Sequence, residues 1–180
     1  LPEFAHDPKN LVKLYETMVL TRTFDAKAIA LQRTGRLGTY PSSLGQEAIA
    51  VGMGSAMHAD DVLFPYYREY GAHLQRGVEM SEIYAYWGGD ERGSAFANCH
   101  DFPHCVPIAS QTLHAAGVAT AMKLRGQKRC AVAAIGDGGT SKGDFYEAVN
   151  VAGAWQLPLA IVVNNNQWAI SVRRDTQTSC

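Results

Sequence analysis

Two turns rich in glycine and amide side chains follow the two longest apolar runs of the chain, and they carry the residues best suited to chemistry. Gly136-Asp137-Gly138-Gly139 follows the run Ala131–Ile135, and Asn164-Asn165-Asn166 follows the run Leu157–Val163. Glycine has no Cβ atom, so backbone N–H groups in such a turn can face an oxyanion. A carboxylate and a neutral amide oxygen together form a hard, all-oxygen donor set. Asp137 and Asn166 are therefore candidates to hold a divalent cation that bridges phosphate groups.

One strand–helix–strand unit is expected to bring these two turns together. The apolar runs 131–135 and 157–163 indicate two buried strands, and residues 144–155 between them have the pattern of an amphipathic helix. Strands joined in this way are parallel, with a right-handed crossover. Both turns then lie at the carboxyl edge of the sheet, where ligands bind in open α/β sheets.

Three further helices are expected outside this unit. Asp7-Pro8 is a good helix start, an N-cap acceptor followed by proline at the first helical position, and Gly35 can end that helix. The other two are expected from about 46 to 57 and from about 113 to 124. The sequence therefore predicts the α/β class, with an open parallel sheet and flanking helices.

The overall composition excludes several classes of protein. The 180 residues include 16 Lys and Arg against 17 Asp and Glu, a formal net charge of −1, and 47% are hydrophobic. This balance argues against a nucleic-acid or anionic-membrane binder, and no apolar run approaches the roughly 20 residues of a membrane span. We expect one domain over residues 1–180, incomplete at both ends, because the chain opens without methionine and closes on a polar stretch.

The four cysteines indicate reduced thiols in a cytosol-like compartment. Their spacing matches no small secreted framework. Residues 99–105 contain two cysteines and two histidines, but no second ligand pair follows elsewhere in the chain. We therefore interpret this segment as a polar loop rather than a zinc site.

Two common glycine-rich loops do not fit the turn at Asp137. A phosphate-binding loop needs Gly-Lys followed by Ser or Thr, whereas this chain has Ser141-Lys142-Gly143 in another order. A dinucleotide fingerprint needs a third glycine where Ser141 stands, and an acid where the next strand ends in asparagine. A nicotinamide-binding fold is therefore the weaker interpretation.

Gly-Asp-Gly followed after 25–30 residues by Asn-Asn resembles the thiamine-diphosphate motif; Asp137 and Asn166 are 29 residues apart. Residues 136–147 and 165–171 resemble the alpha subunit of the decarboxylating component of 2-oxo acid dehydrogenase complexes, the pyruvate and branched-chain enzymes. Residues 34–38, 45–48 and 66–69 match the same family upstream. The resemblance covers nearly the whole chain, and it implies a truncated thiamine-diphosphate-binding fold of the diphosphate-binding type.

The resemblance also implies a metal and a diphosphate site. Asp137 would bind Mg²⁺ through its carboxylate, Asn166 through its amide oxygen, and Trp168 through its backbone carbonyl. Gly138 and Gly139 would donate backbone N–H groups to the diphosphate of the cofactor.

Three further residues are assigned to the cofactor by the same resemblance. Tyr67 and Arg68 would bind the phosphates from a facing loop, with arginine supplying a planar fork of donors. Ile108 would support the aminopyrimidine ring in the bent conformation of the cofactor.

The chain departs from the family pattern in three stretches, one of which reads Gly93-Ser94-Ala95-Phe96 where relatives often show Gly-Ser-Met-His. Pro41–Leu44 occupies the place where some relatives carry a histidine near the cofactor. Pro107, Ser110 and Gln111 resemble a monovalent-cation loop of the branched-chain relatives, but Val106 lacks the hydroxyl found at its start.

The resemblance implies the alpha subunit of the enzyme that decarboxylates pyruvate and transfers the acetyl group to lipoyl-lysine. No catalytic residue is expected in residues 1–180: the activating glutamate belongs to the beta subunit, a catalytic histidine lies further along the chain, and Glu47 is structural. The expected partners are a beta subunit, in an α₂β₂ heterotetramer, and the lipoyl-bearing dihydrolipoyl acyltransferase. The expected compartment is the bacterial cytoplasm, or the mitochondrial matrix in a eukaryote.

Several alternatives remain open. A branched-chain, acetoin-cleaving or transketolase-like enzyme would use the same cofactor. A non-catalytic diphosphate-binding module is the alternative of another class.

Overall fold

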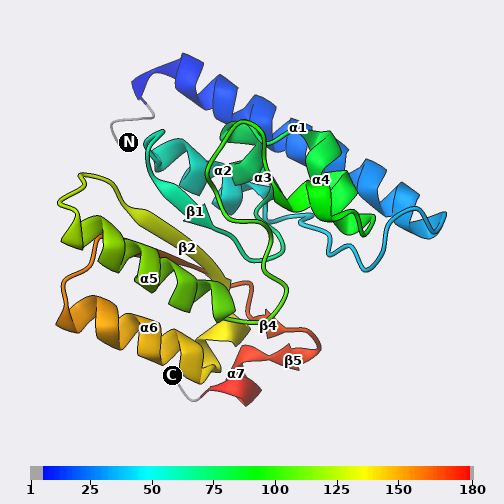
Figure 1. The fold of residues 1–180 in the computed structure, drawn as a ribbon. Coiled ribbons are helices and arrows are strands. Elements are labelled where there is room, and N and C mark those ends of the chain that lie inside the picture. Colours follow the sequence, from blue (N-terminus) through cyan, green and yellow to red (C-terminus); the bar gives the residue numbers. More distant parts are fainter. Residues whose placement is uncertain (1–5, 179–180) are drawn as a thin grey trace. The chain divides into compact units, whose positions relative to one another are not determined.

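The computed structural model describes residues 6–178, which form two compact units (Figure 1). Within the described residues, the helical unit comprises residues 6–57 and 68–100, and the sheet unit comprises residues 58–67 and 101–178. The expectation of a single domain over residues 1–180 stays a prediction.

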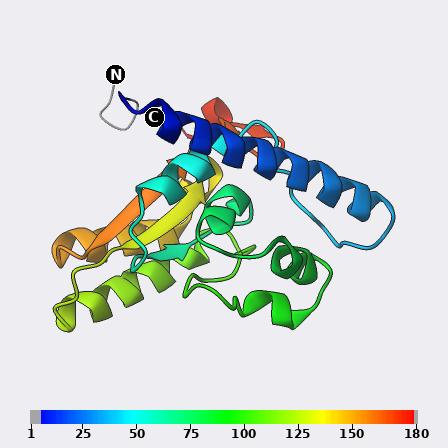
Figure 2. The same cartoon turned by 90° about the horizontal axis from the view of Figure 1, so that it is seen from above.

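The helical unit begins with one long helix. Its helices are α1 (Pro8–Arg33), α2 (Glu47–Ala56), α3 (Tyr70–Gln75), α4 (Met80–Trp87) and the short 3₁₀ helix η2 (Glu91–Ser94). The predicted start of α1 is confirmed, because the Asp7 side chain accepts a hydrogen bond from the Lys9 backbone N–H. Gly35, with φ of +73°, follows its end, where a left-handed residue is common. Figure 2 shows α1 as the long blue helix and the loop that follows it.

An aromatic cluster joins the helices of this unit. The Phe24 ring of α1 stacks on Tyr84 of α4, with ring centroids 4.5 Å apart, and lies 5.5 Å from Tyr70 of α3. Tyr40, in the loop after α1, stacks on Tyr70 at 5.1 Å. These contacts fix the loop against α1 and α3.

The sheet unit contains a three-stranded parallel sheet, with strand order β1-β2-β3. Its strands and helices are β1 (Val62–Phe64), α5 (Ser110–Leu124), β2 (Ala131–Gly136), η3 (Asp137–Ser141), α6 (Gly143–Ala154), β3 (Leu159–Asn164), β4 (Trp168–Ala169), β5 (Val172–Arg173) and α7 (Arg174–Gln177). The predicted strand–helix–strand unit is thus confirmed as β2–α6–β3, with parallel strands.

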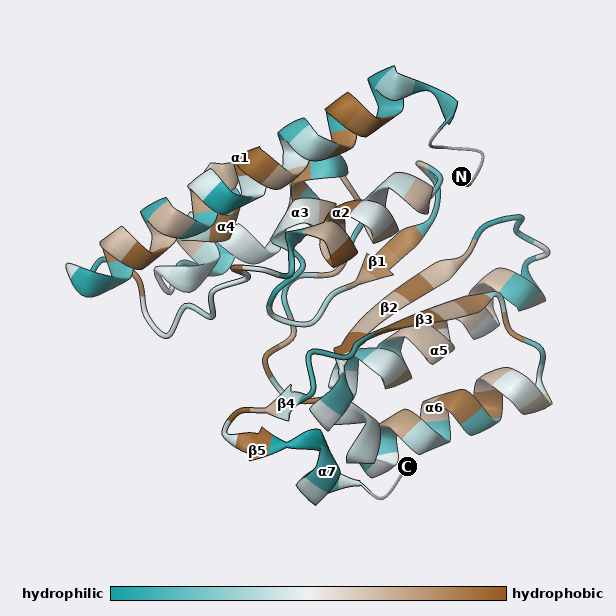
Figure 3. Cartoon of the chain, turned by 180° about the vertical axis from the view of Figure 1, so that it is seen from behind, coloured by the Kyte–Doolittle hydropathy of each residue, from teal (hydrophilic) through white to brown (hydrophobic). Residues whose placement is uncertain are grey.

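Helices α5 and α6 lie side by side on one face of the sheet, as Figures 1 and 3 show from opposite sides. The core between α5 and the strands is built from alanines, including Ala115, Ala119, Ala131 and Ala133, together with Phe64. Small side chains let the helix approach the sheet closely. The strands are among the most apolar segments in Figure 3.

Burial differs between the two predicted strands. Residues 131–135 of β2 are all buried, as expected. The expectation of a buried second strand is wrong: only Asn164 of β3 is buried, and Val163 is 41% exposed. Within the described residues β3 pairs on one side only, with β2, which leaves part of it open to solvent.

The face of α6 is also less buried than its sequence suggests. Of its residues only Ala148 is buried, and Val149 is exposed. The closest backbone approaches of the helix are to α5 and to η3. Strand β1 has three residues and was not anticipated.

Candidate functional site

The two predicted turns lie together at the carboxyl edge of the sheet. Gly136, the last residue of β2, is paired in register with Asn164, the last residue of β3. Asp137 therefore leaves the sheet beside the start of the asparagine turn. The sequence prediction that both turns share one edge is confirmed.

Asp137 is buried at this edge, and its carboxylate makes no hydrogen bond to the described residues. The residue is 7% exposed, and neither carboxylate oxygen has a hydrogen-bond partner within the described residues. Its backbone carbonyl is occupied, because it accepts hydrogen bonds from Thr140 Oγ1 at 2.7 Å and Gln177 Nε2 at 3.3 Å. A buried carboxylate without internal partners is unfavourable unless a cation or donor meets it, so this position fits a divalent metal ion.

Gly138 and Gly139 allow other segments to approach the turn closely. A Cβ atom on Gly138 would lie 2.7 Å from the Cβ of Ala169 in β4. One on Gly139 would lie 2.6 Å from Ile135 and 3.3 Å from the Cγ2 atom of Ile108. The two glycines therefore form a crowded turn that no larger residue can occupy without movement, and Ile108 lies beside it.

The asparagine turn is shaped by its own hydrogen bonds. The Asn166 N–H donates to Asn164 O at 3.1 Å, and the Asn166 Oδ1 accepts from the Trp168 N–H at 2.9 Å. Trp168 begins β4, which pairs antiparallel with β5 and places Trp168 opposite Arg173. The Asn166 amide oxygen keeps a second lone pair, so this contact is compatible with the predicted metal ligation.

Tyr67 lies next to a tyrosine that sequence reasoning did not assign. Tyr66 is buried, and its hydroxyl accepts a hydrogen bond from Asn164 Nδ2 at 2.7 Å. The Tyr66 and Tyr67 rings meet edge to face, 4.9 Å apart. Tyr66 therefore ties the segment after β1 to the end of β3 and orients its neighbour Tyr67.

Arg68 belongs to the helical unit. Its Nη1 donates a hydrogen bond to the backbone carbonyl of Ser42, in the loop between α1 and α2. Seven of the eight predicted site residues belong to the sheet unit, and Arg68 belongs to the helical one.

Gln177 is a residue that sequence reasoning missed. Besides the Asp137 carbonyl, its Nε2 donates to Ser141 Oγ at 2.8 Å, so it anchors both ends of η3. It lies 40 residues after Asp137 in a short polar helix, α7, and no local pattern marks it.

Gln111 joins the start of α5 to the sheet. It is buried, its Nε2 donates to Ala134 O of β2 at 2.7 Å, and its Oε1 has no partner within the described residues. No monovalent-cation site was predicted here, because Val106 lacks the hydroxyl of the family's loop.

Other candidate groups have structural explanations. Glu47 is buried and forms a two-pronged ion pair with Arg22, with Nε–Oε1 at 2.9 Å and Nη2–Oε2 at 3.0 Å, as expected for a structural residue. This contact lowers the pKa of Glu47. Burial raises the pKa of the Cys105 and Cys130 thiols, which does not favour a nucleophilic thiolate.

The described residues contain neither a disulfide nor a metal site of the usual zinc type. No group of three or more His, Cys, Asp or Glu side chains is placed to hold a metal ion in this part of the chain. The interpretation of residues 99–105 as a polar loop stays a prediction. Cys180 lies outside the described residues. Between residues 6 and 178 no helix is long and apolar enough to cross a membrane.

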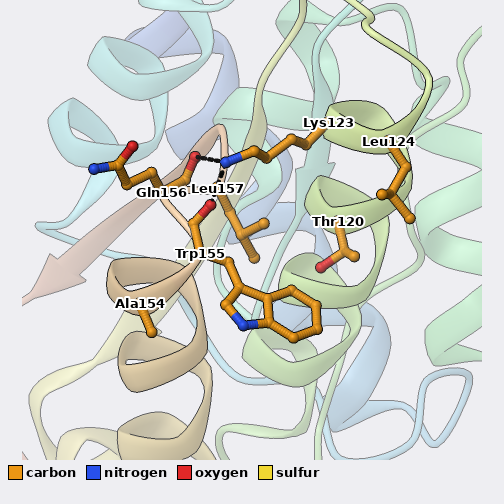
Figure 4. Close-up of a pocket in the computed structure, with 7 residues that line it drawn as sticks. All are labelled: Thr120, Lys123, Leu124, Ala154, Trp155, Gln156 and Leu157. Atoms are coloured by element: carbon orange, nitrogen blue, oxygen red, sulfur yellow. Dashed lines mark hydrogen bonds between the residues drawn. The ribbon is translucent and has the colours of Figure 1, made fainter.

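A small hollow of about 280 Å³ lies where α5 and α6 end (Figure 4). It is lined in part by Leu124, Trp155 and Leu157, and Lys123 Nζ donates to the carbonyls of Trp155 and Gln156. The lysine thus caps the end of α6. Since both helices run back along the strands, this hollow lies at the amino edge of the sheet, opposite Asp137.

The fold and these strand-end residues define an α/β protein of the parallel-sheet class, with a Gly-Asp-Gly turn and an asparagine turn at one edge. The family model for the dehydrogenase E1 component matches residues 15–180. The chain belongs to this thiamine-diphosphate-dependent family of 2-oxo acid dehydrogenases.

Similar curated proteins come from several bacteria. The chain is 43% identical over 164 residues to the pyruvate dehydrogenase E1 component subunit alpha of Acholeplasma laidlawii, covering 91% of this chain and 48% of that protein. It is 42% identical over 167 residues to the 3-methyl-2-oxobutanoate dehydrogenase subunit alpha of Mycobacterium tuberculosis, covering 92% and 46%. A pyruvate dehydrogenase E1 component subunit alpha of Staphylococcus aureus is 38% identical over 172 residues, covering 95% and 46%. The chain thus spans about half the length of these relatives.

Proposed function

We propose that the protein carrying this chain is the alpha subunit of a pyruvate dehydrogenase that binds thiamine diphosphate and Mg²⁺. The observation that carries the proposal is the buried Asp137 carboxylate, which has no internal partner and leaves β2 beside the end of β3. Two relatives named as pyruvate dehydrogenase subunits support the choice of substrate.

In this proposal the sheet unit holds the metal and the diphosphate. Asp137, Asn166 and the Trp168 carbonyl bind Mg²⁺. The N–H groups of Gly138 and Gly139 bind diphosphate oxygens, next to the positive end of α6. Removing the metal should therefore weaken cofactor binding, because the diphosphate and the Asp137 carboxylate would repel one another.

The remaining residues orient the cofactor. Tyr67 and Arg68 bind phosphate oxygens, and Ile108, half exposed beside the Gly139 turn, supports the aminopyrimidine ring. Bound thiamine diphosphate supplies a nucleophilic carbon and an electron sink for the loss of CO₂ from a 2-oxo acid. The chain's own contribution is to hold the cofactor in place.

We assign no catalytic side chain to residues 1–180. We propose that a beta subunit completes the enzyme in an α₂β₂ heterotetramer, and that the acetyl group passes to a lipoyl-bearing dihydrolipoyl acyltransferase. The compartment would be the bacterial cytoplasm or, in a eukaryote, the mitochondrial matrix.

Calorimetry on the full-length protein with its beta subunit tests the cofactor site. Thiamine diphosphate is titrated with and without Mg²⁺ into the wild type, Asp137→Ala, and the control Asp60→Ala, whose side chain is exposed on the same unit. We expect Asp137→Ala to abolish Mg²⁺-dependent binding and the control to bind normally. Unchanged affinity in Asp137→Ala would overturn the metal assignment.

Turnover rates with different 2-oxo acids distinguish the candidate substrates. The Mycobacterium tuberculosis relative, nearly as similar as the first, favours 3-methyl-2-oxobutanoate as a second candidate. Pyruvate and 3-methyl-2-oxobutanoate are therefore compared with the loaded enzyme. Faster turnover of the branched substrate would favour the second candidate, and cofactor binding without turnover of any 2-oxo acid would favour a non-catalytic module.

A further inference from the structure

The loop that connects α1 to α2 is organised by one buried carboxylate. Asp25, on α1, is 3% exposed. Its Oδ1 accepts hydrogen bonds from Tyr40 Oη at 2.9 Å and the Ser43 N–H at 2.8 Å, and its Oδ2 accepts from Ser42 Oγ at 2.6 Å. Burial raises the pKa of Tyr40, so its hydroxyl stays a donor through the neutral range. Ser43 Oγ adds a longer hydrogen bond to Oδ1 at 3.4 Å, so four donors within four residues converge on one side chain.

The far end of the same loop is fixed to the same helix. Arg22 lies three residues before Asp25 and so shares its face of α1, and it holds Glu47, the first residue of α2. The loop is therefore attached at both ends to neighbouring positions of one rigid helix.

The organised loop in turn holds Arg68. The Ser42 carbonyl accepts a hydrogen bond from Arg68 Nη1, and the carbonyl of Pro41 accepts one from Tyr70 Oη at 3.0 Å. Asp25 binds the side chain of Ser42, while Arg68 binds its carbonyl. The carboxylate and the guanidinium are therefore linked through a single residue.

We propose that Asp25 is a positioning residue for Arg68, and that through Ser42 it sets the affinity for the diphosphate of the cofactor. The inference rests on the proposed function, in which Arg68 binds that diphosphate. Hydrogen bonds to a carboxylate are among the strongest in proteins, so Asp25 fixes the loop more firmly than neutral contacts would. A guanidinium fixed in advance loses less freedom when it binds phosphate.

A double-mutant cycle tests the link. The dissociation constant of thiamine diphosphate at saturating Mg²⁺ is measured for the full-length protein with its beta subunit, as wild type, Asp25→Asn, Arg68→Ala and the double variant. We expect a rise of about tenfold for Asp25→Asn, the size found when residues that orient a binding group are removed. In the double variant the constant should equal that of Arg68→Ala, because Asp25 acts only through Arg68.

Tyr84→Phe is the matched control. It removes a hydrogen bond of 3.0 Å from Tyr84 Oη to the carbonyl of Phe24 in α1, in the same aromatic cluster but away from the loop. It should leave the dissociation constant unchanged even if it lowers stability. Where Asp25→Asn does not fold, Ser42→Ala takes its place, because it removes one donor to Asp25 and keeps the carbonyl that Arg68 binds.

The outcomes separate this inference from the proposed function. If Arg68→Ala leaves the dissociation constant unchanged, the proposed role of Arg68 fails and the inference fails with it. If Arg68→Ala weakens binding while Asp25→Asn and Ser42→Ala do not, or if the two effects add in the double variant, only the inference is overturned.

Discussion

Replacing Asp137 by asparagine is expected to stabilise the cofactor-free protein while removing its response to the cofactor. The wild-type carboxylate is 7% exposed, and neither oxygen has a hydrogen-bond partner in the described part of the chain. Such a group weakens the fold by roughly 1–3 kcal/mol, and by more when it is charged. The asparagine side chain has nearly the same shape but no charge, so much of this loss should be recovered.

The size of the effect follows from the length of the protein. At about 2–4 °C per kcal/mol, a gain of 1–3 kcal/mol raises Tm by roughly 2–12 °C. Cofactor and metal at about 1,000 times the dissociation constant should stabilise the wild type by about 4.1 kcal/mol, and the variant by much less. The order of stability should therefore invert when Mg²⁺ and thiamine diphosphate are added.

Scanning calorimetry with a chelator, and then with cofactor and Mg²⁺, measures both halves of this prediction. Asp60→Asn, exposed on the same unit, should change Tm little in either condition. A cofactor-free Asp137→Asn protein less stable than the wild type would refute the reasoning, because the carboxylate would then have a stabilising role within the fold. If cofactor and Mg²⁺ raise the Tm of Asp137→Asn as much as that of the wild type, the metal assignment is refuted.

Three further substitutions test the packing and the charges. Burial raises the pKa of Glu69 from 4.5 to about 8, so the folded protein loses stability as pH rises from about 4.5 to about 8. Glu69→Gln should therefore unfold at a higher denaturant concentration than the wild type, most clearly above pH 8. Gly138→Ala should lower the free energy of unfolding by about 1–3 kcal/mol, because its Cβ would meet Ala169 at 2.7 Å. Glu47→Gln should lose about 1–3 kcal/mol at neutral pH, and the loss should shrink in acid, because Arg22 holds the pKa of Glu47 below its usual value.

Denaturant titrations over a range of pH measure all three, with a glycine substitution in α6 as the control for Gly138→Ala. Gly153→Ala in α6, where a Cβ would meet nothing within 4 Å, should be neutral or stabilising. A stability gap for Glu69→Gln that stays constant from pH 5 to pH 9 would contradict the assigned titration. A Gly138→Ala protein as stable as the wild type would mean that β4 can move away from the turn.

The residues at the strand ends could be predicted to lie together because their placement depends on the succession of neighbouring segments along the chain. An apolar run, a glycine turn and a helix specify a strand–helix–strand return, and its geometry forces Asp137 and the asparagine turn to one edge. The structure bears this out at the strand ends, where Gly136 pairs with Asn164. Predicting that shared edge needed no information about contacts outside the strand–helix–strand segment.

The contacts that hold the site could not be predicted, because they join distant segments. The bond from Asn164 to Tyr66 spans 98 residues, and that from Gln177 to Asp137 spans 40. The exposure of Val163 was missed for a related reason: a continuous apolar run does not reveal on how many sides its strand is paired. Asp25 gave no signal either, since one acid on an amphipathic helix usually faces solvent.

The attachment of the loop to α1 at both ends has a consequence for sequence length. Surface loops normally tolerate insertions, because each added residue changes the closure entropy only slightly. Between residues 40 and 43 an inserted residue would separate the Tyr40, Ser42 and Ser43 donors, which must all reach the one Asp25 carboxylate. Homologous chains should therefore vary in length at the turn around Gly126, where nothing lies within 4 Å of the missing Cβ, and keep a constant spacing here.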